Sequence, residues 1–177
     1  MLDDTVVILT SDNGYFHGEH RIPSSKYLVY DEAIRVPLVV RGPGVARGAT
    51  ATARVANIDL APTIVELTGA TPGRRMDGRS LRPLLADPGG RLDRDLLIET
   101  FPGPTDDRLR FPPSYAAIRT DRFLYAEHAT GELEQYDLDR DPWQLASRHA
   151  DPALAPVRAE LAERLAALRR CAAASCG

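Results

Sequence analysis

Short hydrophobic runs separated by polar turns organise the first half of the chain. The continuous apolar run at residues 5–10 (TVVILT) is rich in β-branched residues and predicts a buried strand. Residues 35–41 (RVPLVVR) predict a second strand, which ends at the breaker Gly42-Pro43-Gly44. Residues 53–57 predict another short strand, and residues 27–34 a short helix with a partial apolar face. This mixture of strands and helices predicts an α/β half.

A helix is predicted at residues 58–69 by its start and stop signals. Asp59 is placed to be the N-cap, Pro62 lies in the first turn, and Gly69 stands where a helix ends.

The second half has a different pattern, and the break at residues 87–90 (DPGG) separates the two. Four short segments separated by turn residues predict strands joined by hairpin turns, and a leucine face at spacings of three and four predicts a terminal helix. The strands are expected at residues 95–100, 114–119, 122–127 and 132–137, the turns at residues 120–121 and 129–131, and the helix at residues 152–171. We therefore expect an α/β part at residues 1–90 and an antiparallel α+β part at residues 91–177.

Composition supports a globular protein and excludes some partners. The chain has 177 residues, of which 44% are hydrophobic, so a core can form. A net charge of −3 gives no electrostatic reason to expect nucleic acid as a partner. No apolar run approaches the roughly 18 residues of a membrane helix, so no membrane partner is expected either.

Both cysteines lie in the last seven residues, at Cys171 and Cys176. One interpretation is a disulfide that closes a small loop, which would indicate an oxidising compartment. The other is a pair of free thiols on a frayed tail.

The stretch after the first predicted strand, Asp12-Asn13-Gly14, has two interpretations. Asn-Gly is typical of tight hairpin turns. However, side-chain oxygens of Asp and Asn are also the hard ligands that Ca²⁺ or Mg²⁺ prefers, and open α/β sheets bind ligands beyond the carboxyl ends of their strands. Two such oxygens need further ligands from elsewhere.

The segment TSDNGYFHGEHRIPSSKYLVYDEAIRVPLVVRGPG closely resembles the C-terminal portion of the sulfatase family, within the alkaline-phosphatase-like superfamily. VANIDLAPTIVELTGA, MDGRSLRPLL, SYAAIRTDRFLYAEH and QYDLDRDPWQL also fit, in order, so the resemblance runs through nearly the whole chain. It is strongest to the branch of N-acetylglucosamine-6-sulfatases and bacterial arylsulfatase-like proteins. The resemblance implies an α/β fold: the C-terminal part of a sulfatase core, followed by a small antiparallel α+β subdomain.

The resemblance also implies a site. In the family, a strand that ends in Ser-Asp-Asn-Gly supplies two ligands to one Ca²⁺ ion, and Asp12 and Asn13 match them. A lysine four residues before an aromatic contacts the substrate sulfate, and Lys26 with Tyr30 matches this pattern. His20, in Gly-Glu-His, matches a histidine near the mouth of the site, so Lys26 and His20 are the catalytic candidates. The implied substrate is a sulfated carbohydrate or an aryl sulfate ester.

The family's nucleophile is a formylglycine made from the cysteine or serine of Cys/Ser-x-Pro/Ala-x-Arg, and this sequence does not contain that motif. We therefore expect a sulfatase fragment that is inactive as an isolated chain and whose remaining Ca²⁺ ligands lie in an absent N-terminal portion or a second chain. The intact family protein is expected to be secreted or periplasmic. Two alternatives stay open: a non-catalytic partner subunit or remnant of the fold, and a phosphate or phosphonate ester hydrolase of the same superfamily.

Overall fold

The computed structural model describes residues 2–100 and 114–176. The packing divides the chain into two compact units. The first unit comprises Met1–Asp12, Pro37–Arg94 and Cys171–Gly177, and the second comprises Asn13–Val36 and Asp95–Arg170. The predicted boundary after residue 90 lies close to the junction at residues 94–95, but the packing assigns Asn13–Val36 to the second unit. The two-part division therefore stays a prediction.

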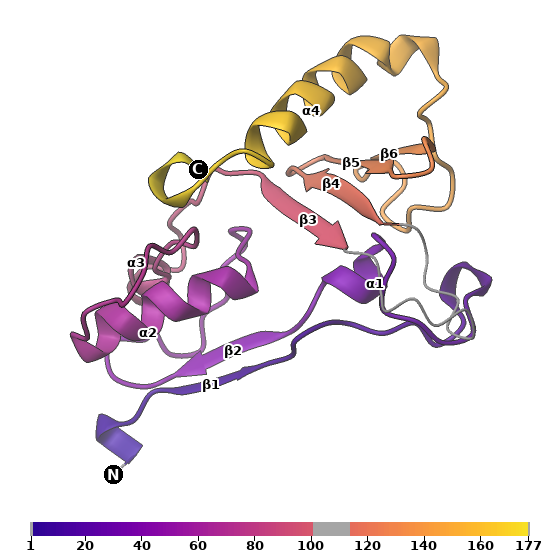
Figure 1. Ribbon diagram of the computed structural model, residues 1–177. Helices are drawn as coiled ribbons and strands as arrows, with labels where there is room; N and C mark the ends of the chain where they lie inside the picture. The colour runs from indigo at the N-terminus through magenta and orange to yellow at the C-terminus, as the bar shows by residue number, and fades with distance from the viewer. Residues whose placement is uncertain (1, 101–113, 177) are drawn as a thin grey trace, which may run out of the picture. The chain divides into compact units, whose positions relative to one another are not determined.

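The first unit contains a two-stranded antiparallel sheet of β1 (Val7–Thr10) and β2 (Leu38–Arg41), in which Leu9 lies opposite Val39 (Figure 1). Both strands lie where the apolar runs predict them. The expectation that residues 5–10 form a buried strand is wrong, because Val7 is 49% and Leu9 59% exposed. Burial of a strand needs a layer packed on its face, and an apolar run does not specify that layer.

Short helices complete the first unit. Gly69 ends α2 in the left-handed conformation (φ 68°), as its position predicts. The strand predicted at residues 53–57 is wrong, because these residues form an irregular segment that leads into a 3-10 turn. The helical elements of this unit are η1 (Leu2–Asp4), η3 (Asn57–Asp59), α2 (Leu60–Thr68), α3 (Arg82–Ala86) and η5 (Ala173–Cys176).

The Asp59 side chain does not cap α2 as predicted. Its carboxylate is fully buried and accepts hydrogen bonds from the backbone N–H groups of Ala56 and Arg79, each at 2.8 Å. It also forms an ion pair with the buried guanidinium of Arg94. One carboxylate therefore ties together three segments that are distant in sequence.

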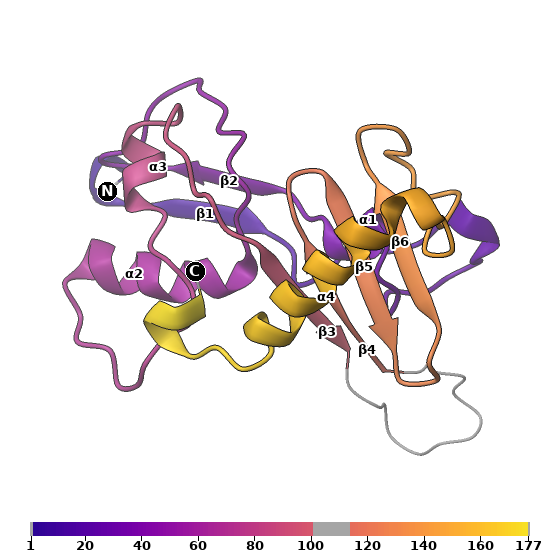
Figure 2. The ribbon, with the colours of Figure 1, turned by 90° about the horizontal axis from the view of Figure 1, so that it is seen from above.

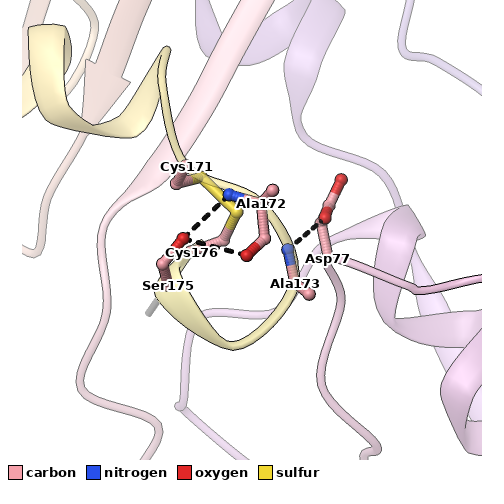
Figure 3. The surroundings of a disulfide bond; sticks show 6 residues. All are labelled: Asp77, Cys171, Ala172, Ala173, Ser175 and Cys176. Carbon is pink, nitrogen blue, oxygen red and sulfur yellow. Dashed lines mark hydrogen bonds between the residues drawn. A yellow bond between two sulfur atoms is a disulfide. The ribbon is translucent and has the colours of Figure 1, made fainter.

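Cys171 and Cys176 form a disulfide, which confirms the first of the two interpretations of the cysteines (Figure 3). The backbone N–H of Ala173, inside the closed loop, donates to Asp77 Oδ1 at 2.6 Å. The last turn of the described chain is therefore held both covalently and by a contact with a distant loop of the same unit.

The second unit is built on a four-stranded antiparallel sheet in the order β3-β4-β5-β6 (Figure 1). The two hairpin turns form where the sequence predicts them, with Gly131 at φ 95° in the second. Each strand lies within one or two residues of its predicted range. The strands are β3 (Leu96–Thr100), β4 (Tyr115–Arg119), β5 (Phe123–His128) and β6 (Leu133–Asp137).

Both faces of this sheet are covered. Ala116 and Ile118 pack with Leu161 and Leu165 of α4 (Ala155–Leu168), which lies across one face in Figure 2. The intervening residues of β4 point to the other face, where they join a cluster around Val29. That face is covered by the segment that leads into α1 (Asp31–Ile34), preceded along the chain by the short turn η2 (Glu19–Arg21). The predicted helix at residues 27–34 thus forms only over its last four residues.

Asp151 precedes the terminal helix and accepts a hydrogen bond from the Ala153 N–H at 2.9 Å, so a short 3-10 turn, η4 (Pro152–Leu154), opens into α4. Among residues 2–100 and 114–176, no helix is both long and apolar enough to cross a membrane.

Candidate functional site

The Asp12-Asn13-Gly14 stretch directly follows β1 and is not a tight hairpin turn. Such a turn requires a positive φ at both central residues, and Gly14 does not have one. Instead, the Gly14 N–H donates to the Ala33 carbonyl at 2.8 Å, and an added Cβ would lie 2.0 Å from the Glu32 carbonyl oxygen. A glycine is needed here because α1 passes directly against the backbone. The hairpin interpretation is wrong, and the metal-site interpretation stays a prediction.

Asn13 and Lys26 are brought together within the second unit. An isolated antiparallel bridge between Phe16 and Ser25 folds residues 13–26 back on themselves. As a result the Lys26 Nζ donates to Asn13 Oδ1 at 3.1 Å, while Asn13 Nδ2 donates to the Gly14 carbonyl at 2.8 Å. The amide is thus oriented with its oxygen towards a cation. Two of the predicted site residues therefore touch.

Asp12 is the last residue of the N-terminal segment of the first unit. The side chain of Asn57 holds the backbone of this segment in place. The Asn57 Nδ2 donates to the carbonyl oxygens of Ser11 and Asp12, each at 3.2 Å. From the sequence, Asn57 is expected only at the end of a strand, with no role at the site. The available signal was an Asn immediately before a predicted helix start, a position where side chains often hydrogen-bond to backbone.

The donor chemistry of Asp12 and Asn13 fits a hard divalent cation. A carboxylate and an amide oxygen are suitable ligands for Ca²⁺, which takes six to eight oxygens. The Asn13 oxygen already accepts a hydrogen bond from the Lys26 ammonium, so it faces positive charge. Within the described parts of the chain no group of three His, Cys, Asp or Glu residues could hold a metal ion. A complete Ca²⁺ site would need further oxygen ligands beside these two.

His20 is held in a different way from Lys26. Its Nε2 lies 3.4 Å from Glu32 Oε2, and its ring stacks on that of Tyr30 with 4.1 Å between centroids. The preceding residue, Glu19, accepts a hydrogen bond from the His17 N–H at 2.6 Å, which lowers the pKa of the Glu19 carboxyl. The histidine therefore sits in a structured turn with an acidic partner.

Comparison with known proteins decides the family. Residues 18–171 match the family model described as N-sulphoglucosamine sulphohydrolase, C-terminal. The chain belongs to the sulfatase family. It is 34% identical to human N-acetylglucosamine-6-sulfatase over 99% of this chain and 37% of that enzyme, and 31% identical to an arylsulfatase of Volvox carteri over 99% of this chain and 31% of that enzyme. This sulfatase chain thus spans about a third of the length of these relatives.

Solved structures confirm the predicted fold class. One is a protein in complex with its substrate D-glucosamine-2-N,6-O-disulfate. The match covers 93% of this sulfatase chain and 34% of the solved protein, with a TM-score of 0.84 and 28% identity. Another is the phosphonate monoester hydrolase of Agrobacterium radiobacter, which matches 94% of this chain and 35% of that chain with a TM-score of 0.81 and 31% identity.

Proposed function

We propose that this chain forms the C-terminal part of an enzyme that hydrolyses sulfate esters of carbohydrates or aryl alcohols. The observation that carries the proposal is the contact between Lys26 Nζ and Asn13 Oδ1 at 3.1 Å, in a chain of the sulfatase family. This contact joins the two kinds of group that such a reaction needs: a cation for the sulfate oxygens and an oxygen ligand for a metal.

Composition adds support for Lys26. It is the only lysine in the sequence, and the other 21 of the 22 basic residues are arginines. An ammonium is a compact point charge that arginine does not reproduce. All the remaining basic positions carry arginine. The single lysine therefore stands at the one place where a sulfate-contacting ammonium is proposed.

The proposed roles follow from the groups themselves. Asp12 and Asn13 would hold Ca²⁺, which would supply positive charge against the substrate oxygens. The Lys26 ammonium would stabilise negative charge that grows on the sulfate oxygens as the S–O bond breaks. His20, with Glu32 as its acidic partner, would donate a proton to the leaving alcohol or position the sulfate.

The nucleophile is proposed to lie outside this sequence, because no Cys/Ser-x-Pro/Ala-x-Arg segment occurs in it. We propose formylglycine, as in the family, supplied by a segment of the same protein or by a second chain. The isolated chain is proposed to be inactive. The Cys171–Cys176 disulfide is typical of oxidising compartments and supports a secreted or periplasmic location.

A second candidate function is phosphonate or phosphate ester hydrolysis. Two solved phosphonate monoester hydrolases match this chain with TM-scores of 0.81 and 0.80 at 31% and 30% identity. A tetrahedral phosphonate ester presents anionic oxygens to Lys26 in the same way as a sulfate ester, so the groups described here do not separate the two reactions.

The test is to sequence the coding DNA upstream of the Met1 codon, follow the reading frame, and assay the protein that it encodes. Aryl sulfate, glucosamine 6-sulfate and an aryl phosphonate monoester are compared as substrates. For the preferred ester class, Lys26→Ala should lower kcat/KM by about 10²- to 10³-fold, as loss of one preorganised charge-stabilising group does. Lys26→Arg should not restore it.

Arg91→Ala is the matched control, because the Arg91 side chain is 79% exposed and forms an ion pair with the similarly exposed neighbour Asp93. It should leave kcat/KM unchanged. Absence of the nucleophile motif from both the full-length protein and any chain associated with it, or full activity of Lys26→Ala, would overturn the proposal. Turnover confined to the phosphonate ester would favour the second candidate function.

A further inference from the structure

His20 has an unusual backbone that something must hold in place. Its φ of 53° and ψ of 20° lie in the left-handed region, and the next residue, Arg21, has φ 61°. Two consecutive non-glycine residues in this region are strained, and such strain persists only where surrounding contacts enforce it.

Aromatic rings surround the His20 imidazole. The Tyr30 ring is stacked on it, with an interplanar angle of 11° and centroids 4.1 Å apart. The fully buried Phe16 meets both rings edge-on, at 6.2 Å from each centroid and at angles of 87° and 82°. One face of the imidazole and its Nε2, which lies 3.4 Å from Glu32 Oε2, thus have defined neighbours.

Tyr30 is itself tethered at its far end to the sheet. Its hydroxyl donates to Glu134 Oε2 at 3.0 Å, and Tyr136 donates to the same oxygen at 2.5 Å. The other oxygen, Oε1, lies 2.8 Å from His128 Nε2. The Glu134 carboxylate therefore has three partners, which fix its position and with it the end of the Tyr30 ring.

The strand register explains why these groups meet. Ala126 of β5 lies opposite Glu134 of β6, and Ala126 and Tyr136 belong to the hydrophobic cluster that includes Val29. His128 is two residues from Ala126, so its side chain points to the same face. Tyr30 packs against this cluster from the segment before α1.

We propose that Tyr30, anchored through its hydroxyl to Glu134, is a positioning residue that sets the orientation of the His20 imidazole. The geometry stands on the contacts above, whereas its consequence for catalysis rests on the proposed function. In that function, a stack held from the four-stranded sheet fixes the plane in which His20 presents its ring nitrogens.

The hydroxyl of Tyr30 is suited to this role because it keeps its proton. Burial, followed by the charge of Glu134, raises the pKa of Tyr30 to about 12. The hydroxyl therefore remains a donor to the carboxylate throughout the range in which proteins are stable. Phenylalanine would preserve the stack but not the tether, and leucine would preserve neither, so the two contributions are separable.

The experiment uses NMR of the chain with labelled histidine, which gives four ring signals for the four histidines. In the wild type, the Tyr30 ring current should displace the His20 ring-proton shifts from those of an exposed histidine. Tyr30→Leu should abolish this displacement. Tyr30→Phe and Glu134→Gln should reduce it, and Tyr30→Phe should restore part of what Tyr30→Leu removes.

Reactivity gives an independent readout on the same variants. An aromatic pair stabilises by an amount that corresponds to about a 2- to 10-fold change in population, so Tyr30→Leu should raise the rate of His20 carbethoxylation by diethyl pyrocarbonate about 2- to 10-fold. The rate at the exposed His17 should stay unchanged.

Glu127→Gln is the matched control. Glu127 accepts a hydrogen bond from Tyr125 at 2.9 Å, but Tyr125 belongs to the cluster on the opposite face of the same sheet, with Leu161 and Leu165. This variant removes a Tyr–Glu pair without touching His20, so the His20 shifts should not move.

Unchanged His20 shifts in Tyr30→Phe and Glu134→Gln would overturn the proposal. So would His20 shifts that change only together with the methyl signals of Ile118 and Leu161, because that pattern reports a general loss of packing. Neither readout involves ester hydrolysis. Failure of the Lys26 assay would therefore remove the proposed function and leave this inference standing. Unchanged His20 shifts would remove this inference and leave the proposed function standing.

Discussion

The two units of the chain are stabilised by different means. In the second unit, both faces of the sheet carry hydrophobic clusters, with Ile118, Leu124 and Leu165 completely buried. In the first unit, the buried residues among those described are two leucines and three polar side chains, namely Leu81, Leu84, Asp59, Thr63 and Arg94. Three apolar side chains of its two-stranded sheet, Val7, Leu9 and Val39, are exposed instead. An apolar run thus becomes a core only where another layer covers it, and elsewhere a hydrogen-bonded polar cluster can hold the chain together.

The polar cluster of the first unit should be its most sensitive point. Asp59→Asn should destabilise the first unit by about 3–5 kcal/mol, because it leaves the buried Arg94 guanidinium without its charge partner. Hydrogen exchange of the amides in α2 measures the effect. The control Glu66→Gln breaks the exposed pair with Arg82 and should cost about 0–1 kcal/mol. Equal effects of the two variants would show that the Asp59 cluster is not what holds this unit.

A leucine-to-alanine substitution in each unit should show the difference between the two units. Leu165→Ala removes a side chain with no exposed surface and should lower the free energy of unfolding by about 2–5 kcal/mol. Leu9→Ala alters a side chain that is 59% exposed and should change it by about 0.5 kcal/mol or less. Urea unfolding followed by circular dichroism measures both. A large loss of stability in Leu9→Ala would contradict the contrast between the two units.

Opening the disulfide should act on the first unit alone. For a bond between residues five apart, the loop-entropy model predicts a loss of about 2 kcal/mol on reduction. The local readout is the Ala173 amide, which donates to Asp77 Oδ1 and should exchange faster in the Cys171→Ser/Cys176→Ser variant. Unchanged protection of this amide would show that the contact with Asp77 holds the loop without the covalent bond.

The smallest expected effect is a dependence on pH in the second unit. Hydrogen bonds from Arg122 lower the pKa of the Asp137 carboxyl below its ordinary value of 3.8. A carboxyl whose pKa is lower in the folded state adds stability above the unfolded-state pKa and loses it as pH falls through the folded-state pKa. Acid unfolding of Arg122→Gln should therefore begin at a higher pH than that of the wild type. The control Arg91→Gln should leave the pH at which acid unfolding begins unchanged. A shift of similar size in both variants would show that the Arg122–Asp137 pair is not the cause.

The sequence predicted the candidate site unevenly. Motif spacing identified Asn13 and Lys26, which the fold then brings within 3.1 Å of each other. Motif spacing did not identify Asn57 or Glu134. Each hydrogen-bonds to a segment far away in the sequence, and these contacts exist only once the chain is folded. Similarly, Asn-Gly indicated a hairpin by local preference, whereas Gly14 is required by the passage of α1 against it. The metal and catalytic roles of Asp12, Asn13, Lys26 and His20 stay predictions.

The sequence by itself determined the elements whose signals are local: the short strands of the second half, the hairpin turns at residues 120–121 and 129–131, the Gly69 helix end and the leucine face of α4. It also determined the family, because ordered motifs run along nearly the whole chain. Only the tertiary structure decided that the strand at residues 5–10 is not buried, that Asp59 pairs with Arg94 instead of capping α2, and that Tyr30 stacks on His20. The physical reason is that hydrogen bonding within a turn or helix depends on neighbours in sequence, whereas burial and ion pairing depend on which segments meet in space.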